Sequence, residues 1–166
     1  MTDRIVVLEL AQLEAAHLSD LVGQFEALLR GTPGGDALHD PAIARLVPDA
    51  YRDDAAASDE FRSMTQGELL DRRVDDAAVV LASLRVDGRP VRVEGLDEDS
   101  ARTVLTLPLD ATQTAAWLRT LTSLRLVMAS RLGIGHESDH DPEDPRFGVY
   151  DWLGYRLEGL LQALED

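Results

Sequence analysis

The sequence predicts a predominantly helical α+β domain, in which four long amphipathic helices accompany a small three-stranded sheet. In four long segments apolar residues recur at intervals of three and four, which is the period of a helix with one buried face. Three short segments instead alternate in polarity or run in β-branched residues, as strands do. The length of 166 residues is that of one domain, so we expect residues 1–166 to form a single unit.

The first half of the chain is expected to contain one strand and four helices. Residues 5–10, IVVLEL, form a short β-branched run that is typical of a buried strand. Gly31 ends a periodic segment as a helix C-cap does, and Asp40 precedes a proline, which is a usual start of a helix. Thr65 and Glu68 are spaced as in a capping box, so a new long helix is expected to begin there. The expected helices span residues 11–30, 41–46, 54–64 and 65–84.

The second half is expected to return to strands before its last two helices. Residues 90–94, PVRVE, and 103–107, TVLTL, alternate in polarity as strands with one buried face do. Together with residues 5–10 they make up the expected three-stranded sheet. Asp110 is the expected cap of the next long helix, and Asp144 opens the last one. These two helices are expected at 111–132 and from 145 almost to the C-terminus.

Charge is the strongest compositional feature, because 16 basic residues against 31 acidic ones give a net charge of −15. Such a chain is repelled by nucleic-acid phosphates, so direct DNA binding without a partner is not expected. The chain has no Cys, which excludes disulfides, thiolate metal sites and thiol switches. It has neither an apolar run of about 18 residues nor a signal-peptide pattern, which predicts a cytoplasmic location and no membrane span.

No motif in the sequence assigns a catalytic residue, a metal site or a cofactor. The glycines of residues 31–35 lack the Lys-Ser/Thr pair of a phosphate-binding loop, so a plain helix-ending loop is expected. His136 and His140 stand in an acidic loop that its prolines make irregular. The loop begins like a calcium loop, but Asp144 stands where such a loop needs Gly and Tyr150 where it needs Glu. A solvated acidic loop is expected, with weak divalent-cation binding as the alternative.

Charged side chains fall on the inner faces of all four predicted long helices. At 100° per residue, each lies within about 40° to 60° of the apolar stripe of its own helix. These residues are Glu14, His17, Arg73, Arg125 and Arg156. Buried charge without a partner is too costly to keep, so the groups should meet partners. One interpretation is a structural network in which Glu14 and other carboxylates neutralise the Arg residues. The other is a pocket whose excess positive charge binds a small anion by forked hydrogen bonds.

The last helix carries an aromatic face apart from its leucine stripe. Four of the eight aromatic residues of the chain lie between Phe147 and Tyr155. Gly148, Trp152, Tyr155 and Gly159 share an arc of about 60° on the helix. This face either packs on the domain's own sheet or loops, or it is a surface for self-association or for a partner, because Trp and Tyr often anchor interfaces.

From residue 48 onward the sequence contains the motifs of a known family. The runs DAYR…EFR…T, WL…L…LRL…RLGI and DWL occur in this order. In this combination the chain resembles the actinobacterial domain-of-unknown-function family 2017, and the resemblance covers nearly the whole chain. All basic residues are Arg and Asn is absent, which independently fits a GC-rich actinobacterial genome. The best-described representative of the family is named as an oxidative-stress regulator.

The resemblance implies a small cytoplasmic regulator of stress transcription that acts through a protein partner such as a sigma factor. We therefore expect a non-enzymatic regulatory interaction domain, with homodimerisation as one use of the aromatic face. Because the chain has no Cys, sensing by disulfide formation cannot be carried over from the family. The alternative is a small-anion-binding protein, or an enzyme, that uses the Arg residues of the inner faces.

Overall fold

The computed structural model describes residues 4–32, 39–47, 55–135 and 139–166, and it is predominantly helical, as predicted. The helices are α1 (Gln12–Arg30), α2 (Pro41–Ala44), α3 (Ala55–Ser83), α4 (Glu98–Arg102), α5 (Ala111–Leu132) and α6 (Gly148–Glu165). The strands are β1 (Val6–Ala11), β2 (Arg85–Val86), β3 (Arg89–Pro90) and β4 (Val104–Leu109). Short 3-10 turns span Val93–Gly95 and Pro145–Phe147. In the described part of the chain, none of the helices has the length and apolar character needed to cross a membrane.

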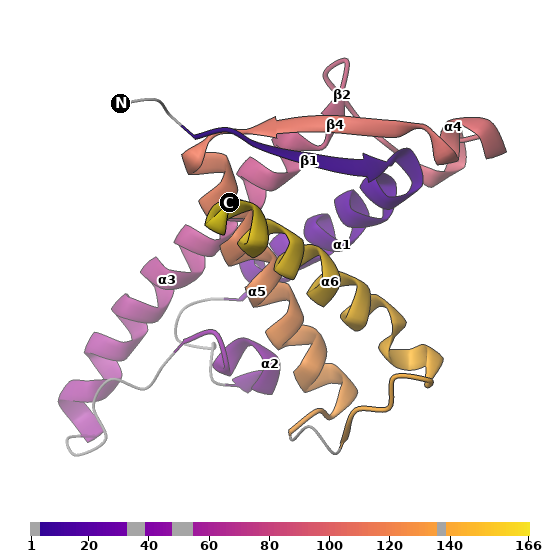
Figure 1. The fold of residues 1–166 in the computed structure, drawn as a ribbon. Helices are drawn as coiled ribbons and strands as arrows, with labels where there is room; N and C mark the ends of the chain where they lie inside the picture. Colours follow the sequence, from indigo (N-terminus) through magenta and orange to yellow (C-terminus); the bar gives the residue numbers. More distant parts are fainter. Residues whose placement is uncertain (1–3, 33–38, 48–54, 136–138) are drawn as a thin grey trace.

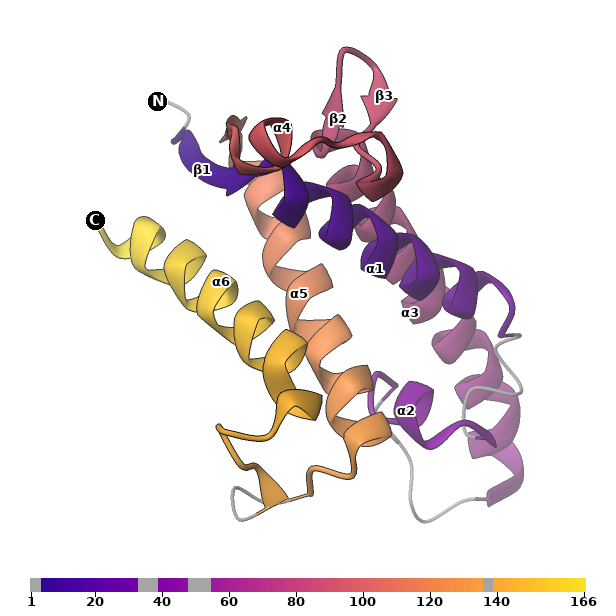
Figure 2. The same ribbon diagram turned by 90° about the vertical axis from the view of Figure 1, so that its right-hand side faces the viewer.

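The long helices pack side by side in the order α1, α3, α5, α6. Strands β1 and β4 lie across one end of the helices, and α1 continues directly from β1 (Figure 1). In the perpendicular view α6 runs along α5 on the side away from α3 (Figure 2). Helix α5 is therefore the central element, with α3 on one side and α6 on the other.

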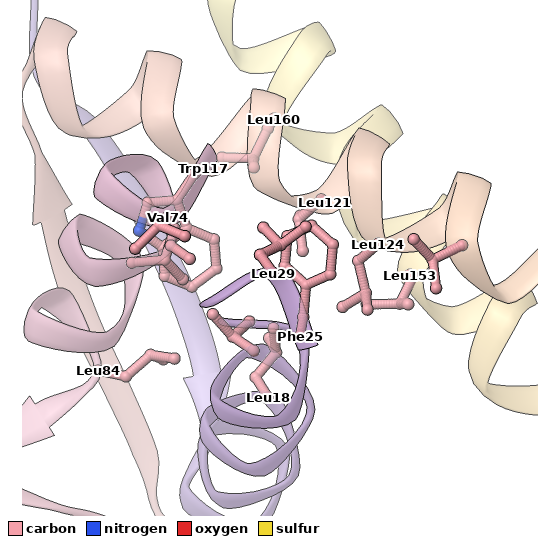
Figure 3. Close-up of a cluster of buried hydrophobic side chains, with 14 of the residues drawn as sticks. Leu18, Phe25, Leu29, Val74, Leu84, Trp117, Leu121, Leu124, Leu153 and Leu160 are labelled. Atoms are coloured by element: carbon pink, nitrogen blue, oxygen red, sulfur yellow. The ribbon is translucent and has the colours of Figure 1, made fainter. Parts of the chain in front are cut away.

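The hydrophobic core gathers around α5, as Figure 3 shows. Trp117 and Leu121 of α5 are 1% and 0% exposed, and α1, which carries Phe25 and Leu29, lies below α5 in that view. Leu153 of α6 is completely buried on the opposite side of α5. The apolar spacing read from the sequence therefore identifies the buried faces of these helices.

Several helix ends follow the local rules that the sequence shows. The Asp110 carboxylate accepts a hydrogen bond from the Gln113 N–H at 2.8 Å, and the Gln113 side chain accepts one from the Asp110 N–H at 2.9 Å. This reciprocal pair is the predicted capping box of α5. Gly133 ends α5 with φ +75°, a left-handed conformation that glycine adopts without strain. Asp40 caps α2 by accepting from the Ala42 N–H at 2.9 Å, as predicted.

The predicted break between two helices near residue 65 is wrong, because α3 is one continuous helix from Ala55 to Ser83. Thr65 lies within it, ten residues from its start. A Thr-Glu spacing of three is compatible with a helix interior as well as with a cap, and no proline interrupts the segment. The capping-box pattern alone therefore did not identify a helix start.

Strands β1 and β4 pair antiparallel, with Val6 opposite Leu109 and Ala11 opposite Val104. The N–H of Gln12 donates to the Thr103 carbonyl in the same register at 2.9 Å. Because hydrogen-bonded pairs alternate along an antiparallel ladder, the even-numbered residues of β1 bond to β4. The odd-numbered residues of β1 direct their N–H and C=O groups to the free edge of the strand. Pro108 of β4 likewise faces away from β1, where its missing N–H costs no ladder bond.

The sheet is two-stranded, so the predicted third strand at residues 90–94 is wrong. Asp87 and Gly88 have φ values of +51° and +76°, which make a tight turn that pairs β2 with β3 as a separate hairpin. The chain then enters the 3-10 turn at Val93–Gly95. Pro90 pairs within this hairpin, and Val93 and Glu94 lie in the 3-10 turn, so residues 90–94 do not join β1 and β4.

Candidate functional site

The structure brings two of the inner-face charges together. Arg156 of α6 donates through Nη2 to Oε2 of Glu14 in α1, and through Nη1 to the Glu9 carbonyl of β1 at 3.2 Å. The Nε1–H of Trp152 donates to the same Glu14 oxygen at 3.4 Å. The side chains of Arg156 and Glu14 are 20% and 31% exposed, so the pair is largely shielded from water. This tie fastens α6 to the junction of β1 and α1.

Arg73 lies on the other side of the bundle. It donates to the Ser123 hydroxyl of α5 at 2.5 Å and to the Leu46 carbonyl at 3.0 Å. Burial lowers the pKa of the Arg73 guanidinium from its ordinary value, and the carboxylate of Asp76 opposes this. Arg125 lies on the α6 side of α5, since positions 123 and 125 are about 200° apart around a helix.

The inner-face charges therefore do not form one shared cluster. Arg73, Arg125 and Arg156 line three separate depressions, and His17 is exposed at the rim of a fourth. The wheel angles place Glu14, Arg73, Arg125 and Arg156 on half-buried sides of their helices, but the inner position predicted for His17 is wrong because that side chain is exposed. They do not say which neighbouring helix the side chain faces, and here the neighbours differ.

The aromatic face of α6 lines two depressions. Gly148 and Trp152 border the α1–α6 groove, a cavity of about 370 Å³ that also contains His17. Tyr155 and Gly159 border the β1–α6 groove, a cavity of about 760 Å³ along the free edge of β1. The Arg156–Glu14 tie separates the two grooves. Trp152 is half-buried, whereas the Tyr155 side chain is 71% exposed.

The sheet exposes an apolar surface beside the β1–α6 groove. Ile5 and Val7 are 52% and 57% exposed, and Val104 of β4 is 58% exposed on the same face. Val6, Leu8 and Leu10 are buried, so β1 is buried on one face only. The sequence predicts a buried strand here, because a continuous apolar run hides this alternation. Glu9 among the apolar residues is the one signal of an exposed face.

On the other side of α6 lies the α5–α6 pocket, a cavity of about 540 Å³. Its polar lining consists of Arg45, Thr122, Arg125, His140, Tyr150 and Asp151. Nε2 of His140 lies 2.6 Å from Oδ1 of Asp151, and the His140 ring lies 5.2 Å from that of Phe147. The sequence predicts His140 in a solvated loop and gives no signal of its pairing with Asp151, which stands eleven positions later on α6.

The acidic loop before α6 does not assemble a metal site from its described residues. In the described part of the chain, no group of three or more His, Asp or Glu side chains is placed to hold a metal ion. His136 lies outside the described residues. Asp144 accepts from the guanidinium of Arg146, which holds the pKa of that carboxyl below its ordinary value.

Comparison with known proteins gives one positive result. No curated protein matches the chain, and no solved structure matches it. A family model described as a domain of unknown function, DUF2017, matches residues 1–164. Because this match covers nearly the whole chain, the protein belongs to the DUF2017 family.

Proposed function

We propose that this protein is a non-enzymatic regulatory domain that binds a protein partner along the free edge of β1 and the adjoining face of α6. The observation that carries the proposal is the free edge itself. The N–H and C=O of Val7 point away from β4, and no described group bonds to them. A two-stranded sheet is marginal by itself, and an extended segment from a partner is able to add a third strand at such an edge.

The side chains around this edge suit a protein ligand. Val7 and Ile5 on the sheet and Tyr155 on α6 are exposed beside the groove, and exposed apolar surface of this kind is typical of interaction sites. The Glu9 carbonyl already accepts a hydrogen bond from Arg156, so the part of the β1 edge that remains open lies before Glu9. A short extended segment whose apolar side chains cover Val7 and Tyr155 fits this surface.

The charge of the protein favours a basic partner. Glu9 and Glu158 are exposed and line the β1–α6 groove, and the whole chain carries a net charge of −15. Electrostatic attraction raises the rate of encounter with a basic protein and disfavours DNA alone. The family resemblance supports an actinobacterial, cytoplasmic regulator of the oxidative-stress response with a sigma factor as partner. Because the sequence contains no Cys, this activity does not depend on thiols of the protein.

A pair of substitutions at Val7 tests the proposal. Val7→Pro removes the edge N–H without removing a bond to β4, whereas Val7→Thr keeps the N–H and the β-branched shape. The immobilised protein is exposed to extract of a GC-rich actinobacterium, and captured proteins are identified by mass spectrometry. We expect a basic protein to be captured by wild type and Val7→Thr and lost with Val7→Pro.

Two outcomes contradict the proposal. One is equal capture by wild type and Val7→Pro when both have the same circular dichroism spectrum. The other is tight sequence-specific DNA binding by the purified protein in a gel shift at about 150 mM salt, where exposed charges are largely screened.

Sedimentation of wild type and Trp152→Ala separately tests self-association through the α6 face, which predicts a smaller species for the variant.

A further inference from the structure

The α5–α6 pocket contains two guanidinium groups that no carboxylate of the described chain neutralises. Arg125 is half-buried, and its one hydrogen bond, from Nε to the Tyr150 carbonyl at 3.4 Å, goes to an uncharged group. Arg45 is exposed at the rim and forms no ion pair with a described residue. In a protein with 31 acidic residues and 16 basic ones, a half-buried Arg without a carboxylate needs an explanation.

The surroundings of Arg125 hold its guanidinium in one position. The group lies over the Tyr150 ring at 4.2 Å from the ring centre, a cation–π arrangement. The group also lies close to Gly154, where an added Cβ would be 2.9 Å from Nη2 of Arg125. The absence of a side chain at Gly154 therefore makes room for the guanidinium. Nη1 and Nη2 have no acceptor among the described residues, so they are available to water or to a ligand.

The charge balance of the pocket is positive. Within its described lining, Asp151 supplies the single carboxylate, and that carboxylate is bonded to His140. Arg45 and Arg125 thus give the lining a formal charge of +1 with His140 neutral, in a chain whose total is −15. Fixed guanidinium groups in a hollow are suited to carboxylate or phosphate, whose oxygens accept paired hydrogen bonds.

The rest of the lining is hydrocarbon. Leu126, Ala129, Ile134 and Leu157 form the apolar wall of the cavity. Inorganic phosphate has no group that would cover this wall, whereas an organic acid with a short hydrocarbon chain covers it. A volume of about 540 Å³ is within the range of small-molecule sites, which are mostly apolar with a few polar anchors.

We propose that the α5–α6 pocket binds a small organic carboxylate, with the carboxylate on Arg125 and Arg45 and the hydrocarbon chain against the apolar wall. The site is independent of the partner surface, because its lining shares no residue with the β1–α6 groove. It also differs from the anion site expected from the sequence, because it uses Arg125 without Arg73 or Arg156.

Calorimetric titration of the whole protein with hexanoate tests the proposal. Inorganic phosphate and hexanol serve as the probes that carry only the anion or only the hydrocarbon. Arg125→Gln and Arg45→Gln remove one guanidinium each, and Arg89→Gln removes an exposed Arg of the β2–β3 hairpin as the matched control. Arg45 is exposed, so its loss leaves the fold intact even if Arg125→Gln proves unstable.

We expect saturable hexanoate binding that weakens about tenfold or more in Arg125→Gln and in Arg45→Gln, since a charged hydrogen bond contributes about 1.5–3 kcal/mol. Arg89→Gln should bind as wild type does. No saturation at about 10 mM hexanoate, or equal affinity in wild type and Arg45→Gln, would overturn the proposal. Phosphate binding tighter than hexanoate would overturn the choice of an organic acid, and hexanol binding as tight as hexanoate would overturn the role of charge.

Discussion

The Glu14–Arg156 tie yields the most quantitative prediction, through Glu14→Gln. The substitution keeps the shape of the side chain and removes the negative charge that faces Arg156. Removing one member of a fully buried ion pair costs roughly 3–5 kcal/mol, because the other charge is left without a partner. Here the two side chains retain 20% and 31% exposure, and Arg156 keeps its bond to the Glu9 carbonyl. We therefore expect the free energy of unfolding to fall by about 2 kcal/mol.

A double-mutant cycle with Arg156→Met isolates the pair from the effects of each side chain alone. Unfolding in urea at pH 7 gives the four free energies, and we expect a coupling of about 1–2 kcal/mol. The exposed pair of Glu98 and Arg102, four residues apart on α4 with side chains 84% and 77% exposed, is the matched control, with an expected coupling of about 0.3–0.5 kcal/mol.

A coupling for Glu14 and Arg156 no larger than that of the control pair would refute this reasoning. It would mean that water solvates the two charges as well in the folded protein as in the unfolded chain. The tie would then contribute nothing to the docking of α6. Each single substitution leaves one charge without its partner, the Arg156 guanidinium in Glu14→Gln and the Glu14 carboxylate in Arg156→Met, so both are expected to destabilise the fold.

Three further predictions concern the fold. Leu153→Ala removes a completely buried side chain between α5 and α6, and should lower the free energy of unfolding by about 3 kcal/mol in urea titrations. Gly133→Ala forces a Cβ into a left-handed conformation at φ +75° and should cost about 1 kcal/mol in the same assay, although no atom obstructs the methyl group. The Arg131 guanidinium holds the pKa of Asp40 below its ordinary value. Ionised Asp40 therefore stabilises the fold at pH values above that ordinary pKa, and this contribution to stability is lost as the pH falls through the lowered pKa. The stability difference between wild type and Asp40→Asn should accordingly shrink below about pH 4, and a difference that is constant with pH would contradict it.

Much of the helical architecture was predictable, because the buried faces of the long helices follow the spacing of apolar residues. Caps such as Asp110 with Gln113 also follow local rules. The sheet was less predictable, since pairing depends on residues far apart in the chain. The segment 90–94 alternates as a strand does, yet Pro90 pairs within the hairpin formed by the turn at Asp87–Gly88, and Val93 and Glu94 lie in a 3-10 turn.

The candidate sites show the same limit of local reasoning. A helical wheel identified Glu14, Arg125 and Arg156 as inward-facing charges, and all three make contacts with other elements. It did not reveal that Arg125 of α5 faces α6 while Arg73 of α3 bonds to the opposite side of α5, because that depends on which helix packs on which side of α5. The pairing of His140 with Asp151 requires the fold of the preceding loop, which no periodicity encodes.

Pro108 has a consequence for how copies of the protein assemble. It faces the outer edge of β4, so that edge has a gap in its row of N–H donors, whereas the edge of β1 keeps the donor of Val7. Such a sheet is able to add one neighbouring strand at the β1 edge. The outer edge of β4, which then remains, lacks the N–H donor at Pro108. If two copies pair through β1, the contact is symmetric and closes as a dimer, and growth into a fibre is blocked. A proline at this one position thereby disfavours open-ended strand addition through β4.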